Sequence, residues 1–158
     1  MKKLLTTISI SGLLAVSSVA FAQSAQQQRP LTADSSFRLE ARLQPVIAVD
    51  ASGKARLDVE AGTVNDRFTA EMEIAKADFR DVGITPGNGF RDEIVEPRVF
   101  RGGALIYTNR LHFSRNLVND ITFETDIRGT AAPELQAGDT VRVIVNNRYT
   151  LRGTFQVH

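Results

Sequence analysis

The chain has no cysteine and no tryptophan, and it has only two tyrosines and two histidines among its 158 residues. The lack of cysteine excludes disulfides, a thiol nucleophile and thiolate metal ligands. His158 is the last residue, so His112 is the one histidine placed for a Ser-His-Asp triad or a paired metal site. No Gly-x-Ser-x-Gly motif offers the nucleophile. These absences predict a protein that is not an enzyme.

An excess of one charge is also missing. The chain has 19 basic and 18 acidic residues, and 17 basic residues remain when Lys2 and Lys3 are set aside. The charges are interspersed along the chain rather than gathered in blocks. They therefore build no one-sided positive field of the kind that nucleic acid or an anionic membrane attracts, and we expect no nucleic-acid partner.

One uncharged run, residues 4–21, follows the basic start of the chain and ends in the small-x-small sequence Ala20-Phe21-Ala22. This pattern predicts a signal peptide over residues 1–22 and export to the periplasm or the exterior. A transmembrane helix is the alternative, but the Ser, Thr and Gly in the run and the polar residues after it favour cleavage. Residues 23–36 are rich in Gln and Ser and predict a flexible segment before a domain at 37–158.

In the predicted domain, apolar residues recur with a period of two. The clearest runs alternate with charged residues at Phe37, Leu39, Ala41 and Leu43, at Ala55, Leu57 and Val59, at Phe68, Ala70, Met72 and Ile74, and at Val141, Val143 and Val145. Such alternation is typical of strands buried on one side. About eight strands without a credible amphipathic helix predict an all-β fold, a single antiparallel β-sandwich that is immunoglobulin-like or similar, with a closed barrel as the alternative.

Two hairpins can be assigned a register. Residues 102–103 are both glycine and favour a two-residue turn, which places Phe100 opposite Leu105 and Ile94 opposite Leu111. This register leaves polar residues on a partly apolar face, so either the pairing slips or that face is only half buried.

The second hairpin follows the valine-rich strand. A two-residue loop at Asn146-Asn147 would mismatch the two faces, so we expect a three-residue loop at 146–148. That loop places Val145 opposite Tyr149 and Val143 opposite Leu151.

Asp120, Glu124 and Asp126 fall within seven residues. Glu124 and Asp126 share the outward face of a predicted strand, at a separation that overlaps that of inverting glycosidase carboxylates. A solvated strand face with arginine partners explains the same pattern, and we favour it. His112 is likewise expected to be an ordinary surface histidine.

Calcium is the one cofactor that the sequence leaves open. Asp66 and Asp120 lie in oxygen-rich turns, which could ligate calcium if the two turns meet at one end of a sandwich. The same residues are equally well explained as turn residues that bond their own backbone. No spaced acidic loop of the EF-hand type is present.

The segment 77–93 is long for a hairpin, rich in Gly and Pro, and carries Phe90 next to Arg91, with Arg80 nearby in the sequence. An aromatic ring beside a guanidinium is a common anchor of protein interfaces, so Arg80, Phe90 and Arg91 are the predicted protein-contact residues. The alternative is that Phe90 turns inward and covers the open end of the core.

Three segments, "SGKARLDVE" (52–60), "LQAGDTVRV" (135–143) and "LRGTF" (151–155), resemble small β-sandwich modules of secreted bacterial proteins that have no assigned activity. In these segments Gly53 and Gly138 are expected to form turns, and Gly153 to let sheets approach. The resemblance implies an envelope or extracellular module and supplies no catalytic residues.

The sequence as a whole predicts a non-enzymatic binding or structural module that contacts another envelope or secreted protein, without membrane insertion after the leader is removed. A calcium-dependent, small-ligand or carbohydrate-binding β-sandwich and a small hydrolase are the alternatives. Pairing with a second copy through an open strand edge between Arg98 and Tyr107 stays open.

Overall fold

The computed structural model describes residues 35–158, so the predicted signal peptide 1–22 and residues 23–34 lie outside the described part. The strands are β1 (Phe37–Pro45), β2 (Ala51–Val59), β3 (Arg67–Ala75), β4 (Val95–Arg101), β5 (Ala104–Thr108), β6 (His112–Asn116), β7 (Asp120–Arg128), β8 (Thr140–Val145), β9 (Arg148–Thr154) and β10 (Gln156–Val157). The helical elements are η1 (Lys76–Asp78), α1 (Phe79–Val82), η2 (Asn88–Phe90) and η3 (Gly129–Ala131).

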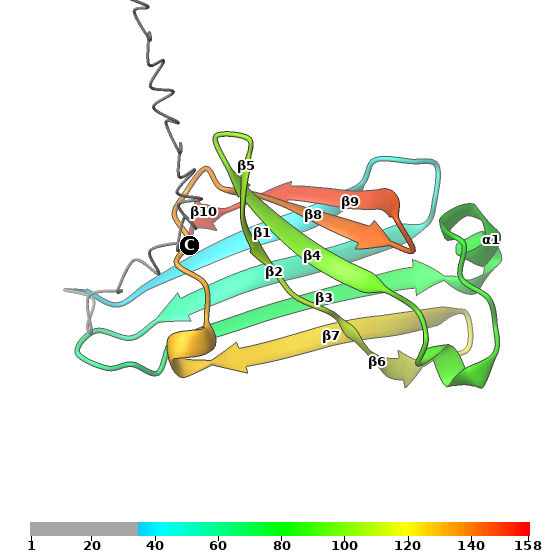
Figure 1. The fold of residues 1–158 in the computed structure, drawn as a ribbon, viewed down its shortest axis with the longest axis horizontal. Coiled ribbons are helices and arrows are strands. Elements are labelled where there is room, and N and C mark those ends of the chain that lie inside the picture. The colour runs from blue at the N-terminus through cyan, green and yellow to red at the C-terminus, as the bar shows by residue number, and fades with distance from the viewer. Residues whose placement is uncertain (1–34) are drawn as a thin grey trace, which may run out of the picture.

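The strands form one antiparallel sheet in the order β5-β4-β8-β9-β1-β2-β3-β7-β6, with β10 paired to β1. The sheet curls into a half-barrel, so that β4 crosses in front of β1, β2 and β3 in Figure 1. The predicted all-β antiparallel class is confirmed. The predicted sandwich of about eight strands is not confirmed, because β1 pairs with β2 on one side and with β9 and β10 on the other, which makes ten strands continuous.

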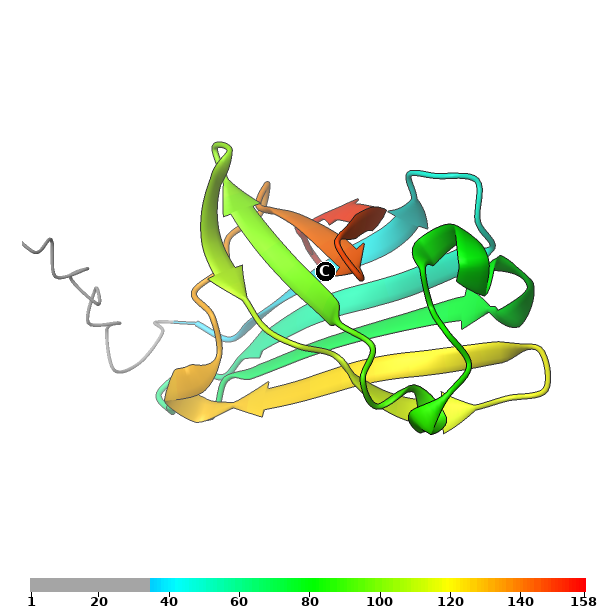
Figure 2. The same ribbon diagram turned by 45° about the vertical axis from the view of Figure 1, so that its right-hand side comes forward.

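The segment that joins β5 to β6 stays hydrogen-bonded to β4. Leu111 lies between β5 and β6, and its N–H donates to the carbonyl oxygen of Val95 in β4 at 2.7 Å. After Leu111 the chain no longer pairs with β4. It continues as β6, which pairs with β7. The short helical elements after β3 lie at one end of the curl, and η3 lies at the other (Figures 1 and 2).

The inside of the curl is the hydrophobic core, and most of the predicted alternation is confirmed. Each apolar residue predicted for the three runs in β2, β3 and β8 is buried, whereas Phe37 at the start of β1 is partly exposed. Phe68, Phe123 and Phe155 are among the largest fully buried side chains. Burial of these rings removes a large apolar area from water and stabilises the fold.

Two glycines allow tight packing around Leu43 of β1. A Cβ atom on Gly53 would lie 2.4 Å from the carbonyl oxygen of Glu71, and one on Gly153 would lie 2.5 Å from that of Arg42. Either Cβ would also lie 3.0 Å from a methyl carbon of Leu43. Gly53 is thus a residue of β2 that permits a close approach, and the prediction that it forms a turn is wrong.

The β4–β5 hairpin has the predicted pair of Phe100 with Leu105. Further along, Val95 rather than Ile94 lies opposite Leu111. The register shifts between Val99 and Phe100, where β5 has one extra residue. This bulge is a slip in the pairing, one of the alternatives that the sequence left open. It places the buried residues Val95 and Leu111 opposite each other.

The β8–β9 hairpin has a two-residue loop, so the predicted three-residue loop is wrong. Asn146 and Asn147 both have positive φ, 45° and 67°, the backbone of a type I′ turn that asparagine tolerates. Val143 nevertheless lies opposite Leu151 as predicted, because the register shifts between Val143 and Ile144. The same bulge turns Tyr149 to the outer face, where it lies opposite Ile144.

The helical elements are short. The α1 helix has four residues and places Phe79 and Val82 in the core. Within residues 35–158 we find no helix with the length and apolar character that a membrane crossing requires.

Candidate functional site

The three predicted contact residues have different environments. Phe90 is half-buried, with its ring centroid 5.5 Å from that of Phe79 and 5.4 Å from that of Phe113. This is the inward position that the sequence offered as the alternative. Arg80 and Arg91 are exposed, and the terminal Nη2 of Arg110 donates to the Arg91 carbonyl oxygen at 3.3 Å. Arg91 is therefore placed for contact, whereas Phe90 mainly packs against other rings.

The two predicted calcium ligands lie far apart. Asp66 precedes β3, and its carbonyl oxygen accepts a bond from the N–H of Gly129 after β7. Asp120 begins β7 and pairs with Ala75 at the other end of the β3–β7 ladder. The full length of β7 separates the two aspartates, so they do not form one site. No group of three His, Asp or Glu residues in the described range is arranged to hold a metal ion.

The outward carboxylates of β7 have different neighbours. Asp126 accepts two bonds from Arg67 at 2.9 Å and a further one from Nη2 of Arg128 at 3.1 Å. These hydrogen bonds lower the pKa of Asp126 to about 2, which makes it a poor proton donor or acceptor near neutral pH. Glu124 instead lies opposite Glu71 of β3 and, on its other side, opposite His112 of β6.

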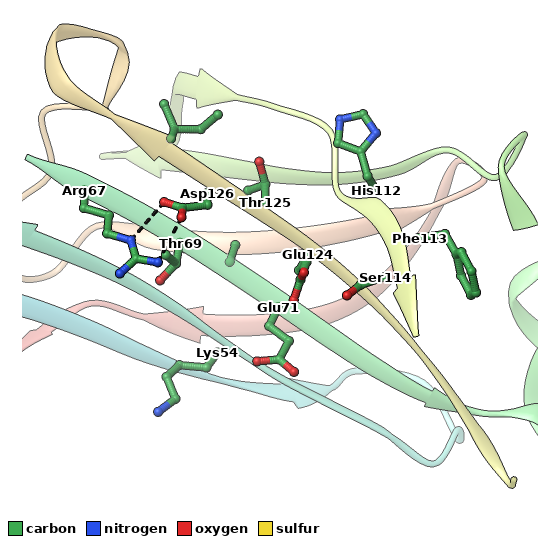
Figure 3. Close-up of a pocket in the computed structure, with 12 residues that line it drawn as sticks. Lys54, Arg67, Thr69, Glu71, His112, Phe113, Ser114, Glu124, Thr125 and Asp126 are labelled. Atoms are coloured by element: carbon green, nitrogen blue, oxygen red, sulfur yellow. Dashed lines mark hydrogen bonds and ion pairs between the residues drawn. The ribbon is translucent and has the colours of Figure 1, made fainter. Parts of the chain in front are cut away.

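The Glu71–Glu124 pair was missed by the sequence reasoning. The two residues are 53 positions apart, and only the pairing of β3 with β7 brings them together. Among the described residues neither carboxylate forms a hydrogen bond or an ion pair. Figure 3 shows the two side by side, with His112 apart from them on β6. Like charges placed directly opposite each other destabilise a sheet slightly.

The same residues line a shallow depression of about 650 Å³. Most of the residues that line it are polar, and three carboxylates stand against two cations, with the Arg67–Asp126 ion pair drawn at one side in Figure 3. The hydroxyl groups of Thr69 and Ser114 also line it. The arrangement offers hydrogen-bond donors and acceptors to a small polar ligand, but it has no nucleophile paired with a base.

A different surface is formed by the β4–β5 hairpin, whose tip stands out from the body in both views (Figures 1 and 2). β5 is one of the two end strands of the sheet, and within residues 35–158 it pairs with β4 alone. Its side chains Leu105 and Ile106 are 53% and 39% exposed. The strand carries no charged residue and no proline, which are the usual protections of an open strand edge.

The turn end of this hairpin is held by an ion pair, since Arg101 is the last residue of β4 before the turn. Arg101 donates from Nε to one carboxylate oxygen of Asp139 at 2.9 Å and from Nη2 to the other at 2.8 Å. The backbone N–H of Gln136 donates to the same carboxylate. Burial of Asp139 raises its pKa, but the bonds from Arg101 and Gln136 outweigh that effect and lower the pKa below its usual value. The turn end of the hairpin is therefore tied to the loop that precedes β8.

Comparison of the chain with protein-family models, with curated proteins and with solved structures found no match.

Proposed function

We propose that the chain is an exported, non-enzymatic binding module that contacts a protein of the cell envelope or exterior through the β4–β5 hairpin. The observation that carries the proposal is the open edge of β5, which combines unpaired strand geometry with exposed Leu105 and Ile106. The leader predicted over residues 1–22 supports export.

The mode of contact is the addition of a partner strand. An exposed edge presents backbone N–H and C=O groups at regular spacing, and an extended segment of a partner can pair with them. The apolar side chains beside the edge then provide area to bury, while the ion pair between Arg101 and Asp139 keeps the hairpin in place. Exposed Arg91 offers a further contact at the other end of the domain, as the sequence predicts.

The test is affinity capture with immobilised residues 23–158 from envelope and secreted fractions of the producing cell. Three proteins are compared: the unchanged chain, the double variant Leu105→Lys/Ile106→Lys, and the control Val118→Lys. Val118 is 91% exposed in the β6–β7 turn, so its change adds the same kind of charge away from the hairpin.

We expect one retained protein that the control also captures and the double variant loses. The purified partner should then protect backbone amides of β5 from hydrogen exchange. Equal capture by all three proteins, or protection only at residues outside β5, would contradict the proposal. Protection of β5 by a second copy of the chain would replace the foreign partner with self-pairing.

A second candidate function is the binding of a small hydroxyl-rich ligand, such as a neutral oligosaccharide, in the depression beside Glu71 and Glu124. The specific observation is that both carboxylates lack a protein partner within the described residues and line the same hollow. NMR titration with neutral oligosaccharides should shift the amide signals of these two residues, and Glu71→Gln should weaken the effect. Unchanged signals throughout the panel would exclude this function.

A further inference from the structure

Three arginines lie in a row on the outer face of the sheet, away from the hairpin edge. Arg98 of β4 lies opposite Arg142 of β8, and Arg142 lies opposite Arg152 of β9. Adjacent strands are about 4.8 Å apart, so three positive side chains start within about 10 Å. Like charges directly opposite each other destabilise the pairing of two strands. The rest of the fold therefore has to offset the repulsion among these three arginines.

The outer two arginines of the row differ in their partners. Nη2 of Arg98 lies 2.6 Å from a carboxylate oxygen of Glu96, two residues away on the same strand. Arg152 is exposed and forms no hydrogen bond or ion pair with any described residue. On its other side Arg152 lies opposite Gln44 of β1, a neutral amide. The positive charge of Arg152 is therefore not compensated within the row.

The guanidinium group of the central arginine, Arg142, lies over two aromatic rings. The guanidinium carbon of Arg142 lies 4.4 Å from the ring centroid of Phe100 and 5.5 Å from that of Tyr149. Tyr149 reaches this position because the bulge in β9 turns it to the outer face. Arg142 forms no hydrogen bond with the described residues, and its Nε atom is buried without a partner.

A half-buried guanidinium without an acceptor is costly, because each N–H that loses water needs another partner. The rings hold the guanidinium plane in a fixed orientation and reduce the conformational entropy that a ligand would otherwise have to remove. A planar guanidinium donates two parallel hydrogen bonds to a carboxylate or phosphate group. The row thus supplies a hydrogen-bond donor of restricted motion, Arg142, beside a cation without a carboxylate partner in the described residues, Arg152.

We propose that Arg142 and Arg152 bind a polyvalent oxyanion, with carboxylate or phosphate groups that contact both guanidinium groups. Glu96 holds Arg98 and compensates its charge, so Arg98 is not one of the two proposed ligand-binding arginines. Phe100 and Tyr149 position Arg142. This site lies on the face of the sheet, and the proposed strand pairing uses the edge of β5, so either can fail without the other.

The experiment is isothermal titration calorimetry of residues 23–158, which include the whole described fold, with pyrophosphate and with citrate at low ionic strength. The variants are Arg152→Gln, the double variant Arg142→Gln/Arg152→Gln, and the control Arg115→Gln. Arg115 is an exposed arginine of β6 without a partner in the described residues, so its loss changes the net charge by the same amount as Arg152→Gln.

We expect saturable binding to the unchanged chain, a loss of affinity of at least about tenfold in the double variant, and a change within about twofold in the control. Stronger binding of citrate would identify carboxylate as the preferred group, and stronger binding of pyrophosphate would identify phosphate. Because Arg152 is exposed, Arg152→Gln should fold normally and should lose part of the affinity even if the double variant unfolds.

The ring signals of Phe100 and Tyr149 should shift during the same titration followed by NMR. The absence of saturable binding, an equal loss in the Arg115→Gln control, or binding that leaves both ring signals unchanged would each overturn the proposal.

Discussion

The outer face of the half-barrel has two halves, and they differ in how often a cation has a carboxylate partner. On β1, β2, β3 and β7 most cations have a carboxylate beside them. The ion pairs are Arg38–Asp58, Arg56–Asp58, Lys54–Glu40, Arg67–Asp126 and Arg128–Asp126. On β4, β8 and β9, three arginines lie opposite one another, and only Arg98 has a carboxylate partner within the row.

The inner faces of the two halves are alike, since both bury aliphatic side chains against the same core. Packing therefore does not require the difference between the outer faces. A surface that needs only solubility is satisfied by the alternating charges of the first half. Under the proposal above, the arginine row serves binding rather than folding, and the following predictions test each part of that statement.

The largest effects should come from changes on the inner side, and they should be equal in the two halves. Gly53→Ala in β2 and Gly153→Ala in β9 would each force a Cβ against a backbone carbonyl and against Leu43. Each change should lower the free energy of unfolding by about 3 kcal/mol, measured by urea denaturation. If one of the two variants is as stable as the unchanged chain, the halves are not equivalent in packing.

A smaller effect is expected at the turn end of the hairpin. The side chain of Asp139 is 1% exposed and accepts bonds from Arg101 and Gln136. Asp139→Ala leaves Arg101 partly solvated but removes these charged hydrogen bonds, which should cost about 2 kcal/mol in thermal or urea unfolding.

The pH dependence of Asp139 has a definite sign. Because its pKa is lower in the folded than in the unfolded protein, its contribution is present above the ordinary pKa of aspartate and is lost as the pH falls. The stability difference between the unchanged chain and Asp139→Ala should therefore shrink in acid. A difference that grows in acid would contradict the assigned pKa direction.

The corresponding aspartate of the other half should matter less. Asp126 is 39% exposed, and its pairs with Arg67 and Arg128 are screened by water. Asp126→Asn should change the free energy of unfolding by less than about 1 kcal/mol, and added salt should reduce that change. The contribution should disappear between the ordinary pKa of 3.8 and the folded value of about 2. A salt-independent loss as large as that of Asp139→Ala would remove the distinction between the two aspartates.

Alternation alone predicted the all-β class and most of the buried residues. It could not predict the single curled sheet, because that sheet depends on β1 pairing with β9, a strand about 100 residues further along the chain. The loop at Asn146 and Asn147 was missed because a two-residue loop mismatches the faces unless a bulge follows, and the bulge at Thr150 has no signal in the residue pattern.

The candidate sites were less predictable, because they depend on pairing between distant strands. Arg98, Arg142 and Arg152 each look like an ordinary outward charge in their own strand. Only the order β4-β8-β9 lines them up, and the sandwich predicted from the sequence did not specify that order. Asp66 and Asp120 show the converse, since the sequence suggests similar turns for both, whereas the structure places them at opposite ends of the β3–β7 ladder.

The smallest effects should come from reversing one charge in the Glu71–Glu124 pair and one charge in the arginine row. Glu124→Lys places a cation opposite Glu71, and Arg152→Glu places a carboxylate opposite Arg142. Each change replaces a like-charge pair with an opposite-charge pair and should stabilise the fold by about 0.5 kcal/mol, measured by urea unfolding at low salt. Arg152→Glu should also abolish oxyanion binding, whereas Glu124→Lys should leave it unchanged. If the arginine row serves a ligand, the Arg152→Glu variant should be more stable than the unchanged chain and should no longer bind the oxyanion. A destabilised Arg152→Glu variant would mean that the arginine row supports the fold itself, and the contrast between the two halves would then lose its functional meaning.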